Sequence, residues 1–336
     1  MSLPIPDENL GIGLALHKGM EEFFRGKDVE EAVQDLHLEW MSTMAGAYEA
    51  AVARGGDPRL KTLLPEWAAL AEGLFRGWVR SQSAKFLAQY EPLMVEEEIE
   101  LPLADGLTLQ TRSDLIIRSR RTGNLYVVNW KTTGRKTGFF EAWNRNIQMW
   151  TEALAVEVKM GEPCSVLPIG FYKGNKKGGS YSTPLIWGYE KNGVWTAKYP
   201  GWNTGFKKVK IWETSSYTLP TGEAGLKAWI DWLPIGLLDE QYFDTPPIQK
   251  DEKVVRDWIR QVVSRERDLE HMLEPGTPEE DRELYFFQRF GTHCNWCPFD
   301  SICQQTTTAK DMIDAGLLVE RKDHHSVVAS SVEGDE

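Results

Sequence analysis

Three of the four cysteines in the chain lie close together, at Cys294, Cys297 and Cys303, in a Cys-x2-Cys-x5-Cys pattern. Thiolates this close together repel one another unless a cation binds between them, and thiolate sulfur is a ligand that suits zinc and iron–sulfur clusters. Four cysteines in 336 residues are too few for a disulfide framework. The pattern therefore predicts a metal-binding segment.

A second polar group occurs where a run of β-forming residues, 126–128, ends. Asn129 and Lys131 follow two residues apart, so on a strand their side chains share one face. If the residues at 122–123 form a two-residue hairpin loop, Asp114 on the preceding strand faces Lys131, with Cβ atoms roughly 5 Å apart. An acid, an amide and an ammonium then meet on one face. An ordinary cross-strand ion pair explains the same residues, and a three-residue loop would separate them.

The elements that must position these residues alternate between helical and strand patterns. Residues 11–90 have helical spacing, and Asp28 with Glu31 resembles a capping pair. Period-2 patterns at 94–101, 111–119 and 124–131, separated by turn signals, predict an antiparallel meander. A helix is expected over 140–161, followed by a further strand. This order predicts an α/β core.

Residues 171–212 differ from the rest of the chain in charge. Eight lysines face one acid, a net charge of +7 that leaves −19 on the other residues. Tryptophans and tyrosines are interleaved with the lysines, and a single-stranded nucleic-acid groove needs both cations and flat rings. A solvated β-hairpin insertion explains the same composition. The candidate strand contacts are Lys173, Lys176, Lys177, Lys207 and Lys208.

The overall composition, with 41% hydrophobic and 26% charged residues, is that of a soluble globular protein. No apolar run is long enough to span a membrane, so no membrane partner is expected and the cytoplasm is the expected compartment. The net charge of −12 argues against nucleic-acid binding by the whole surface but allows a local basic channel. The expected organisation is a helical region 1–92, a core 93–215 containing the insertion 171–212, a helical region 216–305 with the cysteines, and a polar tail 306–336.

The ordered set of motifs resembles the PD-(D/E)XK nucleases, and more narrowly their RecB-like branch, which includes CRISPR-associated and phage recombination exonucleases. The motifs are Gly13-x3-His17, Asp114, the Asn-Trp-Lys-Thr-Thr run at 129–133, Gln148 and the cysteine trio. This resemblance spans residues 13–303. It implies a restriction-endonuclease-like core, a mixed central sheet flanked by helices, and a metal-dependent DNA exonuclease or end-processing nuclease.

The resemblance also implies roles for these residues. The ligands of Mg²⁺ or Mn²⁺ would be His17, Asp114, Asn129 and the carbonyl of Trp130. Lys131 would orient or deprotonate the attacking water, and Gln148 would position the lysine or the phosphate. Single-stranded DNA or duplex ends would be the substrate, and recombination or CRISPR-type proteins would be the protein partners.

In the same branch the cysteine trio joins a distant fourth cysteine to hold a [4Fe–4S] cluster. Cys164 is the remaining cysteine, although it follows the hairpin whereas the family ligand precedes it. His293, directly before Cys294, is the alternative fourth ligand and would make a structural Cys₃His zinc site.

Two positions depart from the family pattern. The family has Asp or Glu where this chain has Asn129, and an amide offers an oxygen ligand without the negative charge. An engineered change, a natural weak or inactive nuclease, or a neighbouring acid such as Glu98 or Glu100 explains this, and the small size of an Asp-to-Asn change favours the first. Glu152 stands where the family has a tyrosine. The alternative functions are a DNA-end-binding protein with a degenerate nuclease site, and a structural cluster protein without DNA affinity.

Overall fold

The computed structural model describes residues 8–53, 59–104, 106–144, 146–215 and 219–273. The chain divides into two compact units, residues 2–263 and residues 264–336 together with Met1. The predicted cysteine trio and the polar tail lie outside the described residues. The predicted hairpin and its neighbouring helices lie in the first unit.

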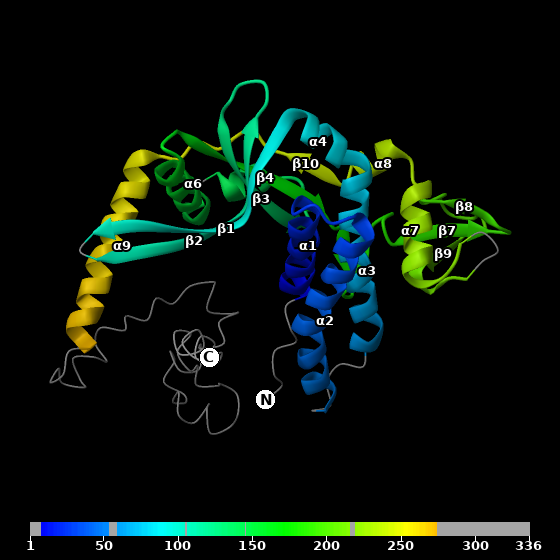
Figure 1. The fold of residues 1–336 in the computed structure, drawn as a ribbon. Helices are drawn as coiled ribbons and strands as arrows, with labels where there is room; N and C mark the ends of the chain where they lie inside the picture. Colours follow the sequence, from blue (N-terminus) through cyan, green and yellow to red (C-terminus); the bar gives the residue numbers. More distant parts are fainter. Residues whose placement is uncertain (1–7, 54–58, 105, 145, 216–218, 274–336) are drawn as a thin grey trace, which may run out of the picture. The chain divides into compact units, whose positions relative to one another are not determined.

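The first unit opens with a helical layer, in which α1, α2 and α3 lie side by side (Figure 1). The helical elements before the first strand are α1 (Glu8–Phe24), α2 (Val29–Ala53), α3 (Leu60–Trp78), the π-helical η1 (Val79–Ser83) and α4 (Ala84–Gln89). The predicted capping pair starts α2. Asp28 Oδ1 accepts the backbone N–H groups of Glu30 and Glu31 at 2.9 Å, and the Glu31 carboxylate accepts the Asp28 N–H at 3.3 Å.

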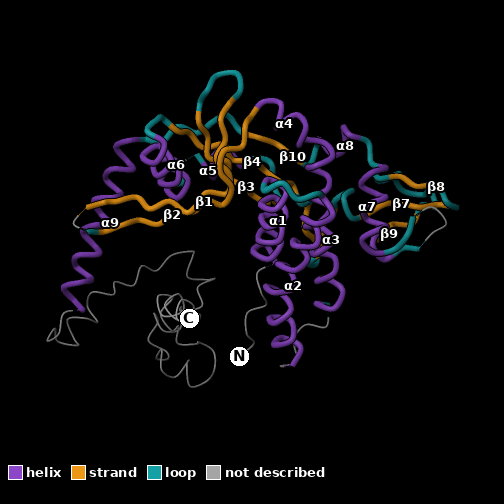
Figure 2. Tube along the Cα trace, viewed as in Figure 1, coloured by secondary structure: helices purple, strands orange, loops and turns teal. Residues whose placement is uncertain are grey.

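A mixed five-stranded sheet of order β1-β2-β3-β4-β10 follows (Figures 1 and 2). The strands are β1 (Tyr90–Ala104), β2 (Leu107–Ser119), β3 (Leu125–Thr133), β4 (Cys164–Tyr172) and β10 (Tyr242–Asp244). β1, β2 and β3 form the predicted antiparallel meander, β4 runs parallel to β3, and β10 is antiparallel to β4. A parallel pair needs a crossover, which α5 (Phe139–Trp143) and α6 (Ile147–Met160) provide. The α/β fold class, a mixed central sheet flanked by helices, is confirmed.

Side chains alternate between the two faces of the sheet, and both faces are buried. On one face, Val128 and Trp130 belong to the core that contains residues of α1, α2 and α3. On the other face, Val127 packs with Ala153 and Val156 of α6. The alternation therefore places Asn129 and Lys131 on the face that α6 covers.

The β2–β3 turn differs from the expected two-residue loop. Ser119 pairs with Asn124, its N–H donating to that carbonyl at 2.9 Å, so the loop holds four residues. Continued by one position beyond Leu115 and Val128, this register sets Asp114 against Asn129, so the predicted pairing with Lys131 is wrong. A four-residue loop moves the register by two positions, which leaves each side chain on its predicted face. The polar residues therefore still share one face.

The helix expected over 140–161 is divided into α5 and α6. Asn146 causes the division, because its extended backbone and its side chain, which accepts the N–H of Met149 at 3.2 Å, cap the start of α6. Gly161 ends α6 with a φ of 72°, a left-handed conformation that glycine adopts easily.

Short elements fill most of the chain between β4 and the last described helix. β5 (Asn175–Lys177) pairs with β6 (Ser180–Ser182), and β8 (Val194–Thr196), β7 (Trp187–Lys191) and β9 (Lys207–Lys210) form a three-stranded sheet. The helical elements after them are η2 (Ile211–Glu213), α7 (Gly222–Trp232), α8 (Ile235–Asp239) and α9 (Glu252–Leu273). None of the described helices combines the length and the apolar character that a membrane span requires.

Candidate metal centre

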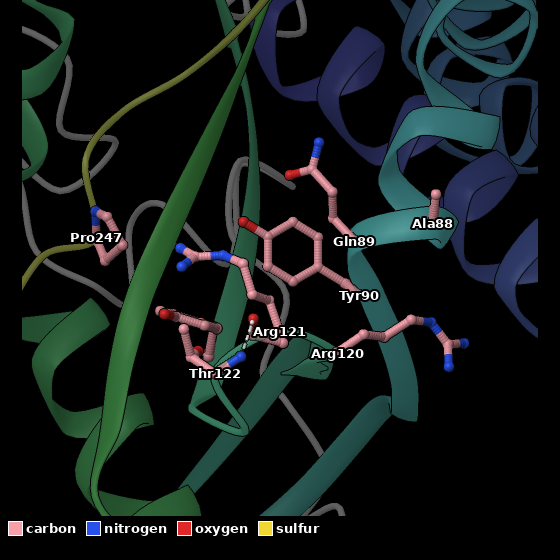
Figure 3. Close-up of a pocket in the computed structure, with 9 residues that line it drawn as sticks. Ala88, Gln89, Tyr90, Arg120, Arg121, Thr122 and Pro247 are labelled. Atoms are coloured by element: carbon pink, nitrogen blue, oxygen red, sulfur yellow. Dashed lines mark hydrogen bonds between the residues drawn. The ribbon is translucent and has the colours of Figure 1, made fainter.

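Two places in the first unit are candidates for a functional site. One is a pocket of about 630 Å³ beside the β2–β3 turn, where the side chain of Arg121 lies beside the Tyr90 ring (Figure 3). None of the nine residues that line this pocket is a histidine, a cysteine or an acid, so their side chains offer few ligands for a metal ion. The second place, towards the far end of β3, holds such ligands.

At this second place β2 and β3 separate. Their registered pairs end at Leu115 and Val128, although β2 begins at Leu107 and β3 continues to Thr133. The N–H of Trp130 donates instead to the Asp114 side chain, with 2.9 Å between N and Oδ2. The Asp114 carboxylate thus replaces the backbone carbonyl that a neighbouring strand would supply. The carbonyl of Trp130 lies beyond the registered pairs with β2 and can accept a hydrogen bond from a side chain of another element.

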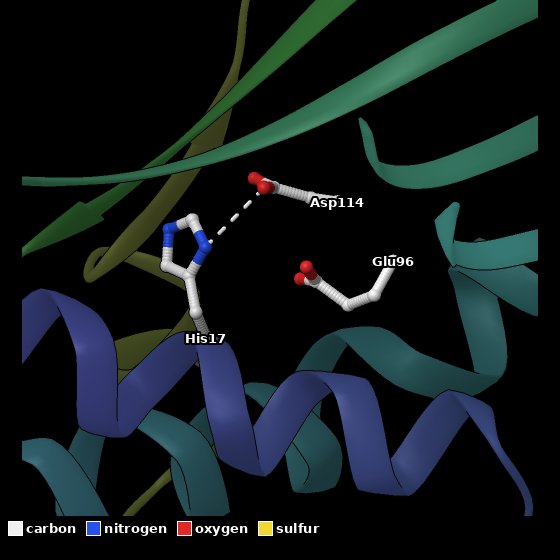
Figure 4. A group of neighbouring side chains, drawn as sticks. All are labelled: His17, Glu96 and Asp114. Atoms are coloured by element: carbon white, nitrogen blue, oxygen red, sulfur yellow. Dashed lines mark ion pairs between the residues drawn. The ribbon is translucent and has the colours of Figure 1, made fainter. Parts of the chain in front are cut away.

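His17 of α1 reaches that carbonyl. Its Nε2 lies 2.8 Å from the Trp130 oxygen, and its Nδ1 lies 3.3 Å from Asp114 Oδ1 (Figure 4). Both partners are acceptors, so the imidazole carries both protons in this arrangement. Burial lowers the pKa of His17, but the charge and hydrogen bond of Asp114 outweigh it, and the pKa is raised above 6.5. Burial likewise raises the pKa of Asp114, and the charge of His17 reverses this, so that pKa is lowered.

The Trp130 ring sets the position of α1 against β3. The ring is 2% exposed and stacks on Phe24 of α1, with centroids 5.8 Å apart and an interplanar angle of 14°. Phe24 follows His17 by seven residues, which is about two helical turns, so both side chains project from the same side of α1. The packing that holds Phe24 therefore also sets how far His17 reaches.

Glu96 of β1 is a third member of the group, and the sequence did not single it out. It lies between the registered pairs of its two neighbours, which places it opposite Asp114. Its φ of 49° is left-handed, a conformation that costs a residue other than glycine about 1 to 3 kcal/mol. The carboxylate pairs with Arg112 at 2.8 Å, and burial followed by the charge of Asp114 raises its pKa to about 7. Strain that is kept at such a point indicates a functional constraint.

The acids that the sequence suggested as substitutes lie elsewhere. Glu98 and Glu100 are exposed, and the Glu100 carboxylate accepts a hydrogen bond from the Gln110 side chain. The acid-rich run of β1 was a correct signal that an acid could approach from this strand. It could not distinguish Glu96, because the left-handed backbone that sets Glu96 apart has no local sequence signature.

Asn129, Gln148 and Glu152 meet on the α6 side of the same region. Asn129 is 1% exposed, and its Nδ2 donates to Glu152 Oε2 at 2.5 Å. Gln148, one helical turn before Glu152, donates to Oε1 at 3.0 Å. Burial, followed by the charge of Asp114, raises the pKa of Glu152 to about 7. The hydrogen bond from Gln148 therefore positions Glu152. From the sequence alone, Glu152 was only a departure from the family pattern.

Lys131 lies on the same face of the sheet as Asn129. Its ammonium is 5.3 Å from the centroid of the Trp143 ring. Its charge also lowers the pKa of His17, Asp114 and Glu152. A cation placed beside these acids is suited to contact a phosphate.

The donor set fits a divalent cation. His17, Glu96 and Asp114 each offer an atom that lies within 4.8 Å of the others, and the Trp130 carbonyl adds an oxygen. Carboxylate and carbonyl oxygens are the ligands that Mg²⁺ and Mn²⁺ prefer, and imidazole is a further ligand for Mn²⁺. The carboxyls of Glu96 and Glu152 are buried in a region where their charged forms are disfavoured, and a cation reverses that preference.

Nearly the whole chain matches a known family. A family model of the PD-(D/E)XK nuclease superfamily matches residues 4–304. The chain belongs to this superfamily. No match was found among curated proteins. Membership implies a metal-dependent nuclease that hydrolyses phosphodiester bonds, with DNA as its substrate. For this PD-(D/E)XK nuclease, the predicted residues of the pattern remain Asp114, Asn129 and Lys131.

The candidate lysines of the nuclease fall into two groups. Lys173 is 2% exposed, with its ammonium 5.3 Å from the Tyr181 ring centroid, and the expected contact with DNA does not fit this burial. The exposed candidates are Lys176, Lys177, Lys207 and Lys208. The Lys208 ammonium lies 4.1 Å from the Trp187 ring centroid, and Trp202 between β8 and β9 is 88% exposed. Cations and an open aromatic ring thus share this part of the chain.

Cys164 is the described member of the predicted cluster ligands. It is 3% exposed at the start of β4 and packs in the apolar core on the α6 face. Burial raises the pKa of its thiol to about 12, so the thiol is neutral in these surroundings. Cys294, Cys297, Cys303 and His293 lie outside the described residues.

Proposed function

We propose that the protein is a DNA exonuclease or end-processing nuclease of the RecB-like branch that uses Mg²⁺ or Mn²⁺. The observation that carries the proposal is the meeting of His17 with Asp114 and the Trp130 carbonyl, 113 residues from His17 in the sequence. A histidine supplied to the metal site by an N-terminal helix is a feature of the RecB-like pattern. Gln148 on the helix after the hairpin supports the same branch.

A bound divalent cation would neutralise charge on the scissile phosphate and lower the pKa of the attacking water. Asp114 Oδ1 and the Trp130 carbonyl oxygen, which now accept hydrogen bonds from His17, are atoms that the chain offers to that ion. His17 must release a proton to become a ligand itself. Lys131 Nζ would orient the attacking water or a phosphate oxygen and would stabilise the charge that develops on the phosphate.

The exposed part of the basic stretch would guide the DNA strand. Lys176, Lys177, Lys207 and Lys208 would contact phosphates, and Trp202 would stack on an unpaired base. These contacts are independent of base identity, so we expect little sequence preference.

The proposal is tested with the full chain, Mg²⁺ or Mn²⁺, and linear duplex, linear single-stranded and covalently closed circular DNA. We expect the linear substrates to be shortened from their ends and the closed circle to stay intact. Asp114→Asn and Lys131→Met should abolish cleavage without loss of circular dichroism, whereas Glu141→Gln, an exposed residue of α5, should cleave as the parent does. Cleavage of the circle would contradict the exonuclease proposal. Salt-dependent binding without any cleavage would support the DNA-end-binding alternative.

We also propose that Cys294, Cys297 and Cys303 hold a structural metal, either a [4Fe–4S] cluster or zinc. The resemblance makes Cys164 the fourth ligand of a [4Fe–4S] cluster, and His293 is the alternative ligand, which would make a Cys₃His zinc site. Metal analysis of anaerobically purified protein should therefore find iron and sulfide in a brown sample. Zinc in a colourless sample would contradict this and favour His293 as the fourth ligand.

A further inference from the structure

We propose that Asn129 and Glu152 form an exchanged pair, in which α6 supplies the carboxylate that the (D/E) position of β3 supplies in the superfamily pattern. Asn129 would retain a neutral oxygen for the ion, and Glu152 would carry the negative charge. The inference rests on the proposed metal-dependent function and identifies a further acid of the same site.

The geometry of the pair is the first support. Both side chains are buried, at 1% and 3% exposure, and the amide nitrogen of Asn129 lies 2.5 Å from Glu152 Oε2. Because the nitrogen of the amide faces the carboxylate, its oxygen is left as a potential ligand atom. The charge that is missing at position 129 is thus present one hydrogen bond away, on the face of the sheet that also carries Lys131.

The partners of the carboxylate are the second support. Within the part of the chain that the structure describes, two amides hold Glu152, those of Asn129 and Gln148, and no cationic side chain lies within 4.0 Å. Burying a carboxylate without a cation is costly, and neutral donors offset only part of that cost. A glutamine at the same place could fill the space and bond the same amides without a charge, once the Asn129 amide turned to present its oxygen. The charge of Lys131 acts on Glu152 without an ion pair between them, so the acid is suited to a bound cation.

A bracing role is the competing explanation, since the hydrogen bond between Asn129 and Glu152 connects β3 to α6. A brace and an exchanged acid respond differently when the charge is moved. In the double variant Asn129→Asp/Glu152→Gln, the new amide can donate to the new carboxylate, so the hydrogen bond is kept with its donor and acceptor interchanged. The negative charge moves back to the strand.

The experiment compares the parent with Glu152→Gln, Asn129→Asp and the double variant. Mn²⁺ affinity is measured by electron paramagnetic resonance of free Mn²⁺, in the absence of DNA, and urea unfolding in EDTA checks that each variant is folded. We expect Glu152→Gln to weaken Mn²⁺ binding about 10- to 100-fold. The double variant should recover to within a few-fold of the parent. Glu157→Gln, on the same helix, is the matched control and should bind Mn²⁺ as the parent does.

Several outcomes would overturn the inference. They are parent-like Mn²⁺ binding by Glu152→Gln, failure of the double variant to recover, and a parent protein that binds no Mn²⁺. The Asn129→Asp variant has two carboxylates in contact, so it should bind Mn²⁺ at least as tightly as the parent and unfold more easily in EDTA. Weaker Mn²⁺ binding by this variant would also overturn the inference.

The inference and the proposed function fail separately. If the parent cleaves linear DNA while Glu152→Gln matches it in both Mn²⁺ affinity and cleavage, the exchanged pair is refuted and the nuclease stands. If no variant cleaves DNA but Mn²⁺ affinity follows the position of the charge, the exchanged pair stands and the exonuclease proposal fails. The pairing gives Asn129 a role as a native residue.

Discussion

Removing the Trp130 ring tests whether aromatic packing on one face of the sheet sets the metal site. The ring lies 5.6 to 6.1 Å, between centroids, from four other aromatic rings, including that of Phe24 on α1. Truncating a buried tryptophan to alanine costs about 3 to 5 kcal/mol, out of a total stability of about 5 to 15 kcal/mol. The backbone N–H and C=O of residue 130 are unchanged. Trp130→Ala should therefore retain the carbonyl ligand and lose the contact that positions His17.

Two measurements separate these effects. Urea unfolding is followed by far-ultraviolet circular dichroism, because fluorescence would combine the signals of 14 tryptophans. We expect a loss of about 3 to 5 kcal/mol for Trp130→Ala and a smaller loss, about 1 to 3 kcal/mol, for Trp130→Phe. Mn²⁺ affinity should fall about tenfold, as for groups that orient a metal ligand.

The matched control is Trp202→Ala, because that side chain is 88% exposed. It should change stability by no more than about 0.5 kcal/mol and leave Mn²⁺ affinity unaltered. If Trp130→Ala and the control cost the same, the packing argument is wrong. If Trp130→Ala is unstable but binds Mn²⁺ as tightly as the parent, the ring stabilises the fold without positioning His17.

Three further predictions concern other parts of the chain. Glu96→Gln should weaken Mn²⁺ binding at least tenfold, whereas Glu98→Gln, which alters an exposed acid two residues along the strand, should not; equal effects would remove Glu96 from the site. The double variant Lys207→Ala/Lys208→Ala should lower the slope of log K against log salt for DNA binding by about 1 per lysine. Lys85→Ala is the control and should leave the slope unchanged. An unchanged slope for the double variant would contradict the proposed role of these lysines in guiding the DNA strand. The hydrogen bond from Arg76 lowers the pKa of Glu30 to about 2, so its stabilisation is present above pH 4.5 and is lost as the pH falls towards 2. The melting temperatures of the parent and Glu30→Gln should therefore converge over that range, and a constant difference would refute the assignment.

Much of the fold could be predicted because local patterns encode it. The capping residues Asp28 and Glu31, the period-2 strands and the helix that ends at Gly161 were all predicted, since each depends on residues a few positions apart. The shared face of Asp114 with Asn129 and Lys131 was also predicted. These residues share that face although the predicted register was wrong by two positions, because side chains alternate with a period of two.

The sequence by itself determined which kinds of residue lie on each strand, and the order of motifs that places the chain among the PD-(D/E)XK nucleases. The tertiary structure alone decided that β2 and β3 separate at Asp114, that Glu96 adopts a left-handed backbone, and that Glu152 contacts Asn129. The physical reason is distance along the chain. Periodicity reports on neighbours within a helical turn or a strand pair, whereas the contact of His17 with Trp130 spans 113 residues and depends on how whole helices pack against the sheet.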